Sequence, residues 1–411
     1  MKVDFCAYDF ASYYNGPNSW MRRLLPQLRS RGVDARVLFI KTADAGPAFD
    51  DLARQGFDCP HFDWYSTTQD KVAWILEQVV RSPPDIFFAN LVAPAYYAGR
   101  WIRAAGIPTV GILHTDDAFY DAIIAEFMQG DPTYRASAMV CVSQWQKTKF
   151  ENMPAEDTVI CRIPYFTPIP SDTARAPTAL LRLVYTGRFV ATQKRVLDLT
   201  RALCRAVQEV PGTEAVLYGD GEARPDMIRI IEEEHATQVH LAGIVDAKRV
   251  QDELLACHAF ALLSDFEGLP ISLLEAMACG VVPICLNIRS GVPELIEPDV
   301  TGLLVDDRGD HFVNAVRRLR NEPGLWARLS RGARAKVERD YTCAAVAGDW
   351  VQLFETLADG RRRDCQISIP SVLELPAVHP ELACEDFRNA AAIVGPRFSS
   401  EDFLAAGARR N

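Results

Sequence analysis

The chain has 411 residues, of which 49% are hydrophobic, and its formal net charge at pH 7 is −10. A chain of this length and hydrophobic content can bury more than one core, so we expect two domains. The negative charge argues against a general nucleic-acid-binding protein. The sequence has no run of 18 apolar residues, and Asp4 interrupts the apolar N-terminal stretch that a signal peptide would need. We therefore expect a cytoplasmic protein.

The chain alternates between strand-like and helix-like patterns, which predicts parallel sheets covered by helices on both faces. In the first half, strands are expected at 3–8, 35–40, 85–89, 109–114 and 139–143, with helices such as 19–31 and 71–81 between them. Four prolines then gather between residues 162 and 177, a composition typical of a linker.

Strands resume after this linker, and the pattern predicts a second α/β domain. They are expected at 181–186, 215–219, 239–241, 259–263, 281–286 and 302–305, and helical spacing follows from 342 to 357. We expect an α/β fold of two Rossmann-like, doubly wound domains facing across a cleft, at 1–167 and 168–345, followed by an extension at 346–411. Ligands in such sheets bind at the carboxyl ends of the strands.

The eleven cysteines are an odd number and include no CxxC pair. Four of them, Cys6, Cys141, Cys257 and Cys285, fall within apolar strand or helix patterns. We therefore expect buried free thiols rather than disulfides or a zinc site.

The segment 264–285, SDFEGLPISLLEAMACGVVPIC, places Glu267 and Glu275 eight positions apart with Pro270 between them. Pro270 suits the first turn of a helix, because no helical carbonyl would accept its missing N–H. We expect Glu267 in the loop after a strand and Glu275 on the next helix, whose start directs free N–H groups towards an anion. The carboxylates suit hydrogen bonding to sugar hydroxyls, and the alternative is a strand–loop–helix unit with solvated glutamates.

A second cluster follows the strand at 181–186. Gly187 permits a sharp turn, Arg188 comes directly after it, and Lys194 lies near the start of the next helix. Two cations near a strand end can neutralise a diphosphate as it becomes a leaving group. The alternative is a pair of ordinary surface charges, and the neighbouring Arg195 is the weaker candidate for phosphate contact.

Taken in order and spacing, these strings resemble the motifs of retaining glycosyltransferases of the GT-B architecture, family 4. The resemblance is strong from about residue 180 to 345 and weaker before that. The matching strings are 185–189, 193–199, 218–222, 239–243, 267–283, 291–296 and 301–305.

The resemblance implies transfer of a hexose from a nucleotide diphosphate sugar to a hydroxyl of a glycan or small-molecule acceptor. A UDP-sugar is favoured over a GDP-sugar. The implied catalytic residues are Arg188, Lys194, Glu267 and His114, with Glu267 on the sugar hydroxyls. The implied donor-binding residues are Gly16, Gly187, Gly219, Gly243, Ile244, Gly268, Leu269, Pro270, Ile271 and Glu275, with Glu275 on the ribose.

The first domain would face the acceptor. His114 ends a predicted strand and resembles the family's histidine near the transferred sugar, while a structural histidine is the alternative. Asp116 or Asp117 could contact hydroxyls, and the sequence does not choose between them. The loop 14–18 departs from the family's paired glycines, because Pro17 removes an amide donor. Gly16 remains a candidate for the donor and Asn18 for the acceptor.

Metal and cofactor are not expected. The chain contains no Asp-x-Asp motif, so protein cations and helix N-termini would take the place of a divalent ion. The resemblance implies that the leaving phosphate helps to deprotonate the acceptor on the same face of the sugar. A Gly-x-Gly-x-x-Gly fingerprint is absent after the first strand, which argues against a dinucleotide oxidoreductase.

Several alternatives stay open. The same architecture could serve epimerisation or phosphorolysis, and a non-catalytic nucleotide-sugar sensor is the alternative from another class. The cluster 20–25, WMRRLL, could touch an anionic membrane at the inner face, although a first amphipathic helix gives the same pattern.

The cleft would close by hinge motion about the linker at 164–177. By resemblance, the helix near 342–357 crosses back to the first domain. The sugar, the acceptor, the oligomeric state and the role of 361–411 cannot be predicted.

Overall fold

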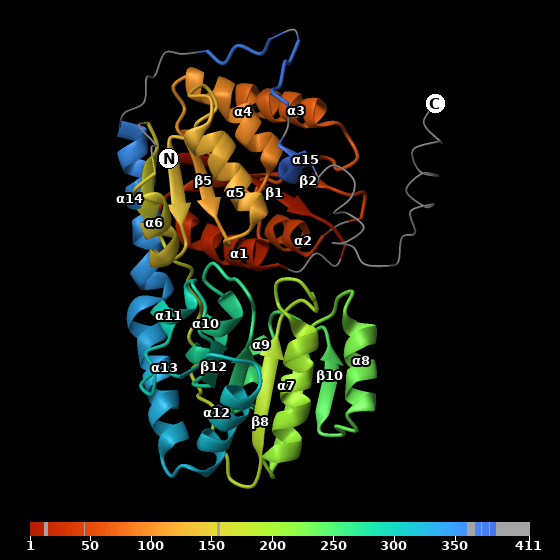
Figure 1. Cartoon of the computed structure of the whole chain (residues 1–411). Coiled ribbons are helices and arrows are strands. Elements are labelled where there is room, and N and C mark those ends of the chain that lie inside the picture. The colour runs from red at the N-terminus through yellow and green to blue at the C-terminus, as the bar shows by residue number, and fades with distance from the viewer. Residues whose placement is uncertain are drawn as a thin grey trace. The chain divides into compact units, whose positions relative to one another are not determined.

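The computed structural model describes residues 1–11, 15–44, 46–153, 157–359, 366–370, 372–377 and 379–383. The chain forms two compact units. The first contains Met1–Ile163 and Ala347–Asn411, and the second is Pro164–Val346. Strands and helices alternate along the chain in each unit (Figure 1).

The first unit contains a seven-stranded sheet in the order β3-β2-β1-β4-β5-β6-β7, and its paired strands are parallel. Its central strands are buried along almost their whole length, as expected of a parallel sheet covered on both faces. The strands are β1 (Lys2–Asp9), β2 (Asp34–Lys41), β3 (His61–Asp63), β4 (Ile86–Asn90), β5 (Thr109–Leu113), β6 (Ala138–Cys141) and β7 (Val159–Arg162). The helices are α1 (Gly16–Arg29), α2 (Pro47–Arg54), α3 (Thr68–Arg81), α4 (Ala93–Ala104), α5 (Ala118–Ile124), the π-helix η1 (Ala125–Gln129) and α6 (Gln144–Phe150).

The second unit contains a six-stranded sheet in the order β10-β9-β8-β11-β12-β13, again with parallel pairs. The strands are β8 (Leu181–Thr186), β9 (Thr213–Tyr218), β10 (Val239–Gly243), β11 (Ala259–Leu262), β12 (Val282–Leu286) and β13 (Leu303–Val305). The helices are α7 (Val196–Glu209), α8 (Arg224–Glu233), α9 (Val250–Leu255), α10 (Ile271–Ala278), α11 (Val292–Leu295), α12 (Asp310–Asn321) and α13 (Leu325–Asp340).

Each sheet reverses its strand order at one point. In the first unit the reversal lies between β1 and β4, and in the second it lies between β8 and β11. Ligands of doubly wound sheets bind outside the carboxyl ends of the strands at such a reversal. The loops that follow β8 and β11 are therefore where topology alone predicts a ligand in the second unit.

The predicted strands are all present, with ends displaced by one or two residues, and the structure adds β3 and β7. These two strands occupy the edges of the first sheet. Their side chains are half-buried or exposed, so neither segment has the continuous apolar pattern from which the other strands were predicted. Helix α1 begins at Gly16 rather than at residue 19, because the side chain of Asn15 caps it by accepting from the N–H of Asn18 (2.7 Å).

Four apolar side chains of the cluster 20–25, those of Trp20, Met21, Leu24 and Leu25, are buried in the first unit. Core packing of α1 therefore accounts for the pattern, as the amphipathic-helix alternative predicts. A contact with a membrane stays a prediction. Among the described residues, no helix is both long and apolar enough to cross a membrane.

The chain returns to the first unit through α14 (Cys343–Asp359), within which the division between the units falls. Trp350 is fully buried, and its ring lies 5.4 Å from that of Trp20. The helix that the resemblance implies is thus present and packs on the first unit.

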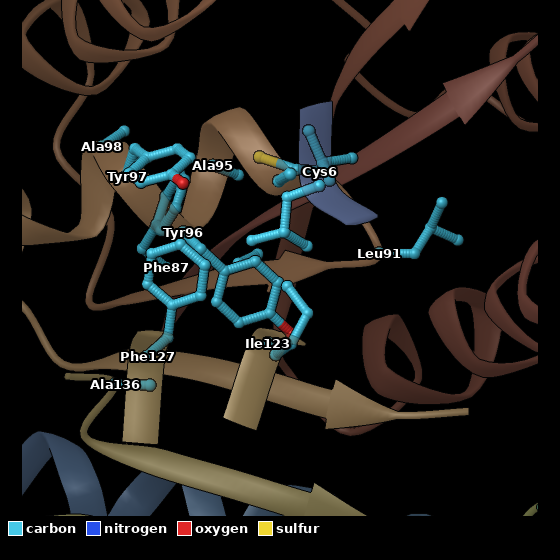
Figure 2. Packing of buried hydrophobic residues seen from close by; sticks show 14 of the residues in the cluster. Cys6, Phe87, Leu91, Ala95, Tyr96, Tyr97, Ala98, Ile123, Phe127 and Ala136 are labelled. Atoms are coloured by element: carbon cyan, nitrogen blue, oxygen red, sulfur yellow. The ribbon is translucent and has the colours of Figure 1, made fainter. Parts of the chain in front are cut away.

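The segment that follows also packs on the first unit. Leu382, in the short helix α15 (Pro380–Ala383), belongs to the core cluster that contains Tyr97 and Phe127, and it is only 3% exposed. Figure 2 shows part of this core, in which the rings of Tyr97 and Phe127 lie 5.0 Å apart. The side chains of Ile367 and Leu373 pack against the same cluster. Residues 366–370, 372–377 and 379–383 therefore belong structurally to the first unit, whereas 384–411, whose role the sequence does not predict, lie outside the described residues.

The cysteines agree with the expectation of free thiols. The nine that the structure describes are free, and the four named from the sequence, Cys6, Cys141, Cys257 and Cys285, are buried.

Candidate active site

Three strands of the second unit end in a row of glycines. The N–H of Gly187, after β8, donates to the carbonyl of Tyr218 (3.0 Å), and the N–H of Gly219, after β9, donates to the carbonyl of Gly243 at the end of β10 (2.8 Å). Gly219 has φ +147°, and a Cβ there would overlap with the carbonyl oxygen of Gly187. Only glycine permits this approach of neighbouring strand ends. Ile244 follows Gly243 with 52% of its surface exposed.

The loop after β8 carries the two predicted phosphate-binding cations. Arg188 is exposed, and its guanidinium donates to the side-chain oxygen of Gln193 (3.2 Å). Lys194 lies just before α7, and its ammonium is 2.5 Å from a carboxylate oxygen of Glu267. The structure therefore brings Lys194 and Glu267 together from the ends of two adjacent strands, β8 and β11.

Glu267 is buried, with 4% of its surface exposed. Its charge is felt by neighbouring groups in the second unit. Burial raises the pKa values of Tyr165, Tyr185 and Cys285, and the carboxylate of Glu267 raises each further because it disfavours a second negative charge. A buried carboxylate needs a cationic or hydrogen-bonding partner, and Lys194 provides one.

Helix α10 begins beside Glu267, as the sequence predicted, but Pro270 is its N-cap rather than a residue of its first turn. The side chains of Leu269 and Ile271 are buried, and a contact of either residue with the donor stays a prediction. Gly268 is fixed by its carbonyl, which accepts from the N–H of Gly291 (2.8 Å). Glu275 is half-buried on the same helix. The arrangement joins a helix N-terminus, which favours anions, to two carboxylates that can accept from hydroxyls.

In the first unit, His114 directly follows β5 and is 6% exposed. Its Nε2 lies 2.7 Å from the side-chain oxygen of Asn90, whose amide nitrogen donates to the carbonyl of Cys6 (3.0 Å). Nε2 must therefore carry the proton. Burial lowers the pKa of His114 to about 3, so the imidazole is neutral at physiological pH. These contacts are the ones expected of a histidine with a structural role, and a contact between His114 and the sugar stays a prediction.

The acceptor candidates of the first unit have partners within the protein. The carboxylate of Asp116 pairs with the ammonium of Lys149 and accepts from the indole N–H of Trp145. Asp117 is the N-cap of α5 and accepts from the N–H of Tyr120 (3.2 Å). Asp116 thus helps to hold α6 in place, and Asp117 caps α5.

Gly16 and Asn18 lie in the first turn of α1 rather than in a loop. The amide nitrogen of Asn18 donates to the carbonyl of Tyr8 (3.0 Å), and the residue is 3% exposed. The nearby Asp9 is also buried, which raises its pKa to about 6. The expected glycine loop is therefore replaced by a helix start whose Asn18 side chain is directed inward.

Three residues that interact with predicted site residues, in one unit or the other, were given no role from the sequence. Gln193 contacts Arg188, Asn90 binds His114, and Tyr165 feels the charge of Glu267. Asn90 has φ +55°, a conformation that asparagine tolerates, so an asparagine at a strand end was a usable signal. Tyr165 lies in the proline-rich linker segment, where periodicity gives no information.

A cavity of about 340 Å³ lies elsewhere in the second unit. It is lined mainly by α13, including Trp326, Ser330 and Arg334, and by Thr173. Arg334 is already bound to Glu338 and to the carbonyls of Asp172 and Pro170. The cavity includes none of the residues predicted from the sequence, so the strand-end site, supported by topology and charge, is the better candidate.

Comparison with known proteins identifies the family of the chain. The family described as Glycosyl transferases group 1 matches residues 181–322, and Glycosyltransferase Family 4 matches residues 14–166. The chain is 27% identical over 306 residues to WcaL of Escherichia coli K12, whose name assigns it provisionally to colanic acid biosynthesis as a glycosyltransferase. This match covers 66% of the chain and 71% of WcaL. AmsK of Erwinia amylovora, an amylovoran biosynthesis glycosyltransferase, is 31% identical over 43% of the chain and 45% of its own length.

Solved structures give the same fold. The lipopolysaccharide outer core galactosyltransferase WaaB aligns with a TM-score of 0.66 at 19% identity, over 87% of this chain and 99% of WaaB. HepE of Anabaena, solved with UDP and glucose, aligns with a TM-score of 0.68 at 17% identity, over 87% of this chain and all of HepE. The fold is therefore GT-B, and the chain belongs to the group 1, or family 4, glycosyltransferases.

Proposed function

We propose that this glycosyltransferase moves a hexose from a nucleotide diphosphate sugar, preferably a UDP-sugar, to a hydroxyl of a glycan acceptor, with retention of anomeric configuration. The observation that carries the proposal is the group formed by Arg188, Lys194, Glu267 and the start of α10 at the strand-order reversal of the second unit. This group joins cations for a diphosphate to carboxylates for hydroxyls. The likeness to HepE, solved with UDP and glucose, supports the choice of donor.

In this proposal the diphosphate lies against Arg188 and the N-terminus of α10. The ammonium of Lys194 moves partly away from Glu267 and also contacts the phosphate. Glu267 then accepts from the sugar hydroxyls, and Glu275 accepts from the ribose. The cations stabilise the negative charge that develops on the leaving diphosphate, and a site without a nucleophile depends chiefly on such stabilisation for its rate. The bond between the anomeric carbon and the diphosphate breaks, and the acceptor oxygen bonds to that carbon on the same face. The oxygen of the leaving phosphate takes the acceptor proton there, and this gives retention.

The proposed reaction needs no divalent metal, since Arg188, Lys194 and the helix N-terminus supply the positive charge. The acceptor is proposed to be a growing glycan. Relatives named for colanic acid and amylovoran biosynthesis, and WaaB, named for the lipopolysaccharide outer core, support this class. His114 would contact the transferred sugar as a neutral hydrogen-bonding group rather than as an acid.

The test is donor turnover in EDTA by the wild type, Lys194→Met and the matched control Arg195→Met. Arg195 is the adjacent cation, and its guanidinium is bound to Asp198 (2.7 Å). We expect Lys194→Met to lower kcat about 100-fold or more, and Arg195→Met to lower it less than about tenfold. The anomeric proton coupling of the first product, followed by NMR, reports the stereochemistry.

Two results would count against the proposal. Activity that is lost in EDTA and restored by magnesium would contradict metal independence. An inverted first product would contradict retention while leaving the glycosyltransferase assignment intact.

A further inference from the structure

Gln193 joins the loops that follow β8 and β11 by hydrogen bonds, beside the ion pairs of Lys194 with Glu267 and of Arg195 with Asp265. Its backbone carbonyl accepts from the N–H of Asp265 (3.0 Å), and its side-chain nitrogen donates to the carbonyl of Phe266 (3.3 Å). Its side-chain oxygen accepts from the guanidinium of Arg188 (3.2 Å). Gln193 thus connects the predicted phosphate-binding arginine to the loop that carries Glu267.

The partners fix the orientation of this amide. A guanidinium can only donate, so it must face the amide oxygen, and a carbonyl can only accept, so it must face the amide nitrogen. A glutamine is the uncharged side chain that offers both groups at this length. The side chain of Arg188 is thereby held through Gln193, and its backbone carbonyl is held by the hydroxyl of Tyr185 (3.0 Å).

The charges of the neighbouring cations are compensated in a different way. Lys194 pairs with Glu267, and Arg195 pairs with Asp198 and Asp265. Arg188 is held by a neutral amide, and no carboxylate within the described ranges lies at ion-pair distance from it. A neutral acceptor fixes the direction of a guanidinium without cancelling its charge, which stays available to an anion.

We propose that Gln193 is a positioning residue that holds Arg188 in its diphosphate-binding orientation while leaving the charge of Arg188 uncompensated. This inference rests on the proposed function, because it assigns Arg188 to the diphosphate of the donor. It adds a residue to which the motif comparison gave no role. Gln193 acts through Arg188 and does not itself contact the donor.

The structure also indicates that Gln193 can be changed without separating the loops. The N–H of Asp265 donates to the backbone carbonyl of Gln193, and this carbonyl is present whatever side chain replaces that of Gln193. The ion pairs of Lys194 with Glu267 and of Arg195 with Asp265 also hold the two loops together. We therefore expect the variants to fold.

The experiment is a double-mutant cycle on the dissociation constant of UDP, measured by calorimetry with wild type, Gln193→Leu, Arg188→Ala and the double variant. Gln193→Leu should weaken UDP binding about tenfold in the wild-type background. In the Arg188→Ala background it should change binding less than about twofold, because the group that it positions is gone. Thr192→Ala, at an exposed neighbouring position, is the matched control and should bind as the wild type does.

Gln193→Glu distinguishes positioning from loop support. Both variants lose the bond to the carbonyl of Phe266, but the carboxylate of Gln193→Glu would also pair with Arg188 and compete with the diphosphate, so this isosteric variant should bind UDP more weakly than Gln193→Leu. Equal losses for Gln193→Leu in both backgrounds, or no loss in either, would overturn the inference and leave the proposed function standing. If the wild type binds neither UDP, GDP, ADP nor inorganic pyrophosphate, both the inference and the proposed function are wrong.

Discussion

At the scale of single residues, the ion pair between Lys194 and Glu267 links the stability of the second unit to its chemistry. Both side chains are largely buried, with 15% and 5% exposed. A pair of this kind is weak evidence for net stabilisation, because desolvation offsets the attraction, but removing one partner leaves a buried charge uncompensated. In the proposed function the same two groups separate in part, because Lys194 binds the diphosphate and Glu267 the sugar.

We predict that Lys194→Met lowers the free energy of unfolding by about 3 kcal/mol, because Glu267 stays buried without its cation. Adding Glu267→Gln should recover most of this loss, since the buried charge is then absent. Urea denaturation measures the change in the free energy of unfolding, and hydrogen exchange in β8 and β11 places it in the second unit. A double variant less stable than Lys194→Met would contradict this explanation.

His114 gives a prediction about pH. Its folded-state pKa, about 3, lies below its ordinary value of 6.5, so the unfolded chain binds one more proton between these values. Stability therefore rises with pH across this window and the contribution is complete above pH 6.5. Between pH 6.5 and 5 the wild type should lose about 2 kcal/mol relative to His114→Gln. Asp9, whose raised pKa gives the opposite slope below pH 6, is common to both proteins. Parallel stability curves for the two proteins would contradict a buried neutral imidazole.

At the scale of elements, the second unit could be predicted from sequence in more detail than the first. The row formed by Gly187, Gly219 and Gly243 and the helix start at Pro270 are local consequences of chain geometry, and local signals reveal them. The short strands β3 and β7 were missed because an edge strand needs no continuous apolar run. Likewise, the hydrogen bonds made by Gln193 depend on the pairing of β8 with β11, which spacing along the chain does not reveal.

The glycine row can be tested with a matched pair of substitutions. Gly219→Ala, at φ +147°, places a Cβ against the carbonyl oxygen of Gly187, whereas Gly243→Ala, also at a positive φ (+81°), meets open space. We expect Gly243→Ala to cost about 1 kcal/mol from backbone strain and Gly219→Ala clearly more, with weaker UDP binding as well. Thermal unfolding and UDP titration of both variants give the comparison. Equal costs for the two substitutions would show that the overlap at Gly219 is relieved without consequence.

At the scale of the whole molecule, the first unit is built from two separate parts of the chain, one before and one after the second unit. From Ala347 onward the described residues belong to the first unit, where Trp350 and Leu382 are buried. The sequence indicated the returning helix through its spacing and the family resemblance. It did not indicate that Ile367, Leu373 and Leu382 pack on the first unit, because this part of the chain has no periodic pattern and binds through single side chains.

We predict that Leu382→Ala destabilises the first unit by about 3 kcal/mol, since it removes a core side chain that is 3% exposed. The matched control Val372→Ala, at a side chain that is 69% exposed, should change stability by less than about 0.5 kcal/mol. Hydrogen exchange in α5, against which α15 packs, reports the loss locally. An effect of Leu382→Ala no larger than that of Val372→Ala would mean that the segment contributes nothing to the core.

The central claim is that the strand-order reversal of the second unit binds a nucleotide diphosphate sugar. Hydrogen exchange of the wild type in EDTA, with and without saturating UDP-glucose and GDP-mannose, tests it most directly. We predict protection of residues 187–195 and 264–275 by the UDP-sugar, and its loss in Lys194→Met. Protection confined to α13 and Thr173, which line the separate cavity, or no protection by either donor, would contradict the claim.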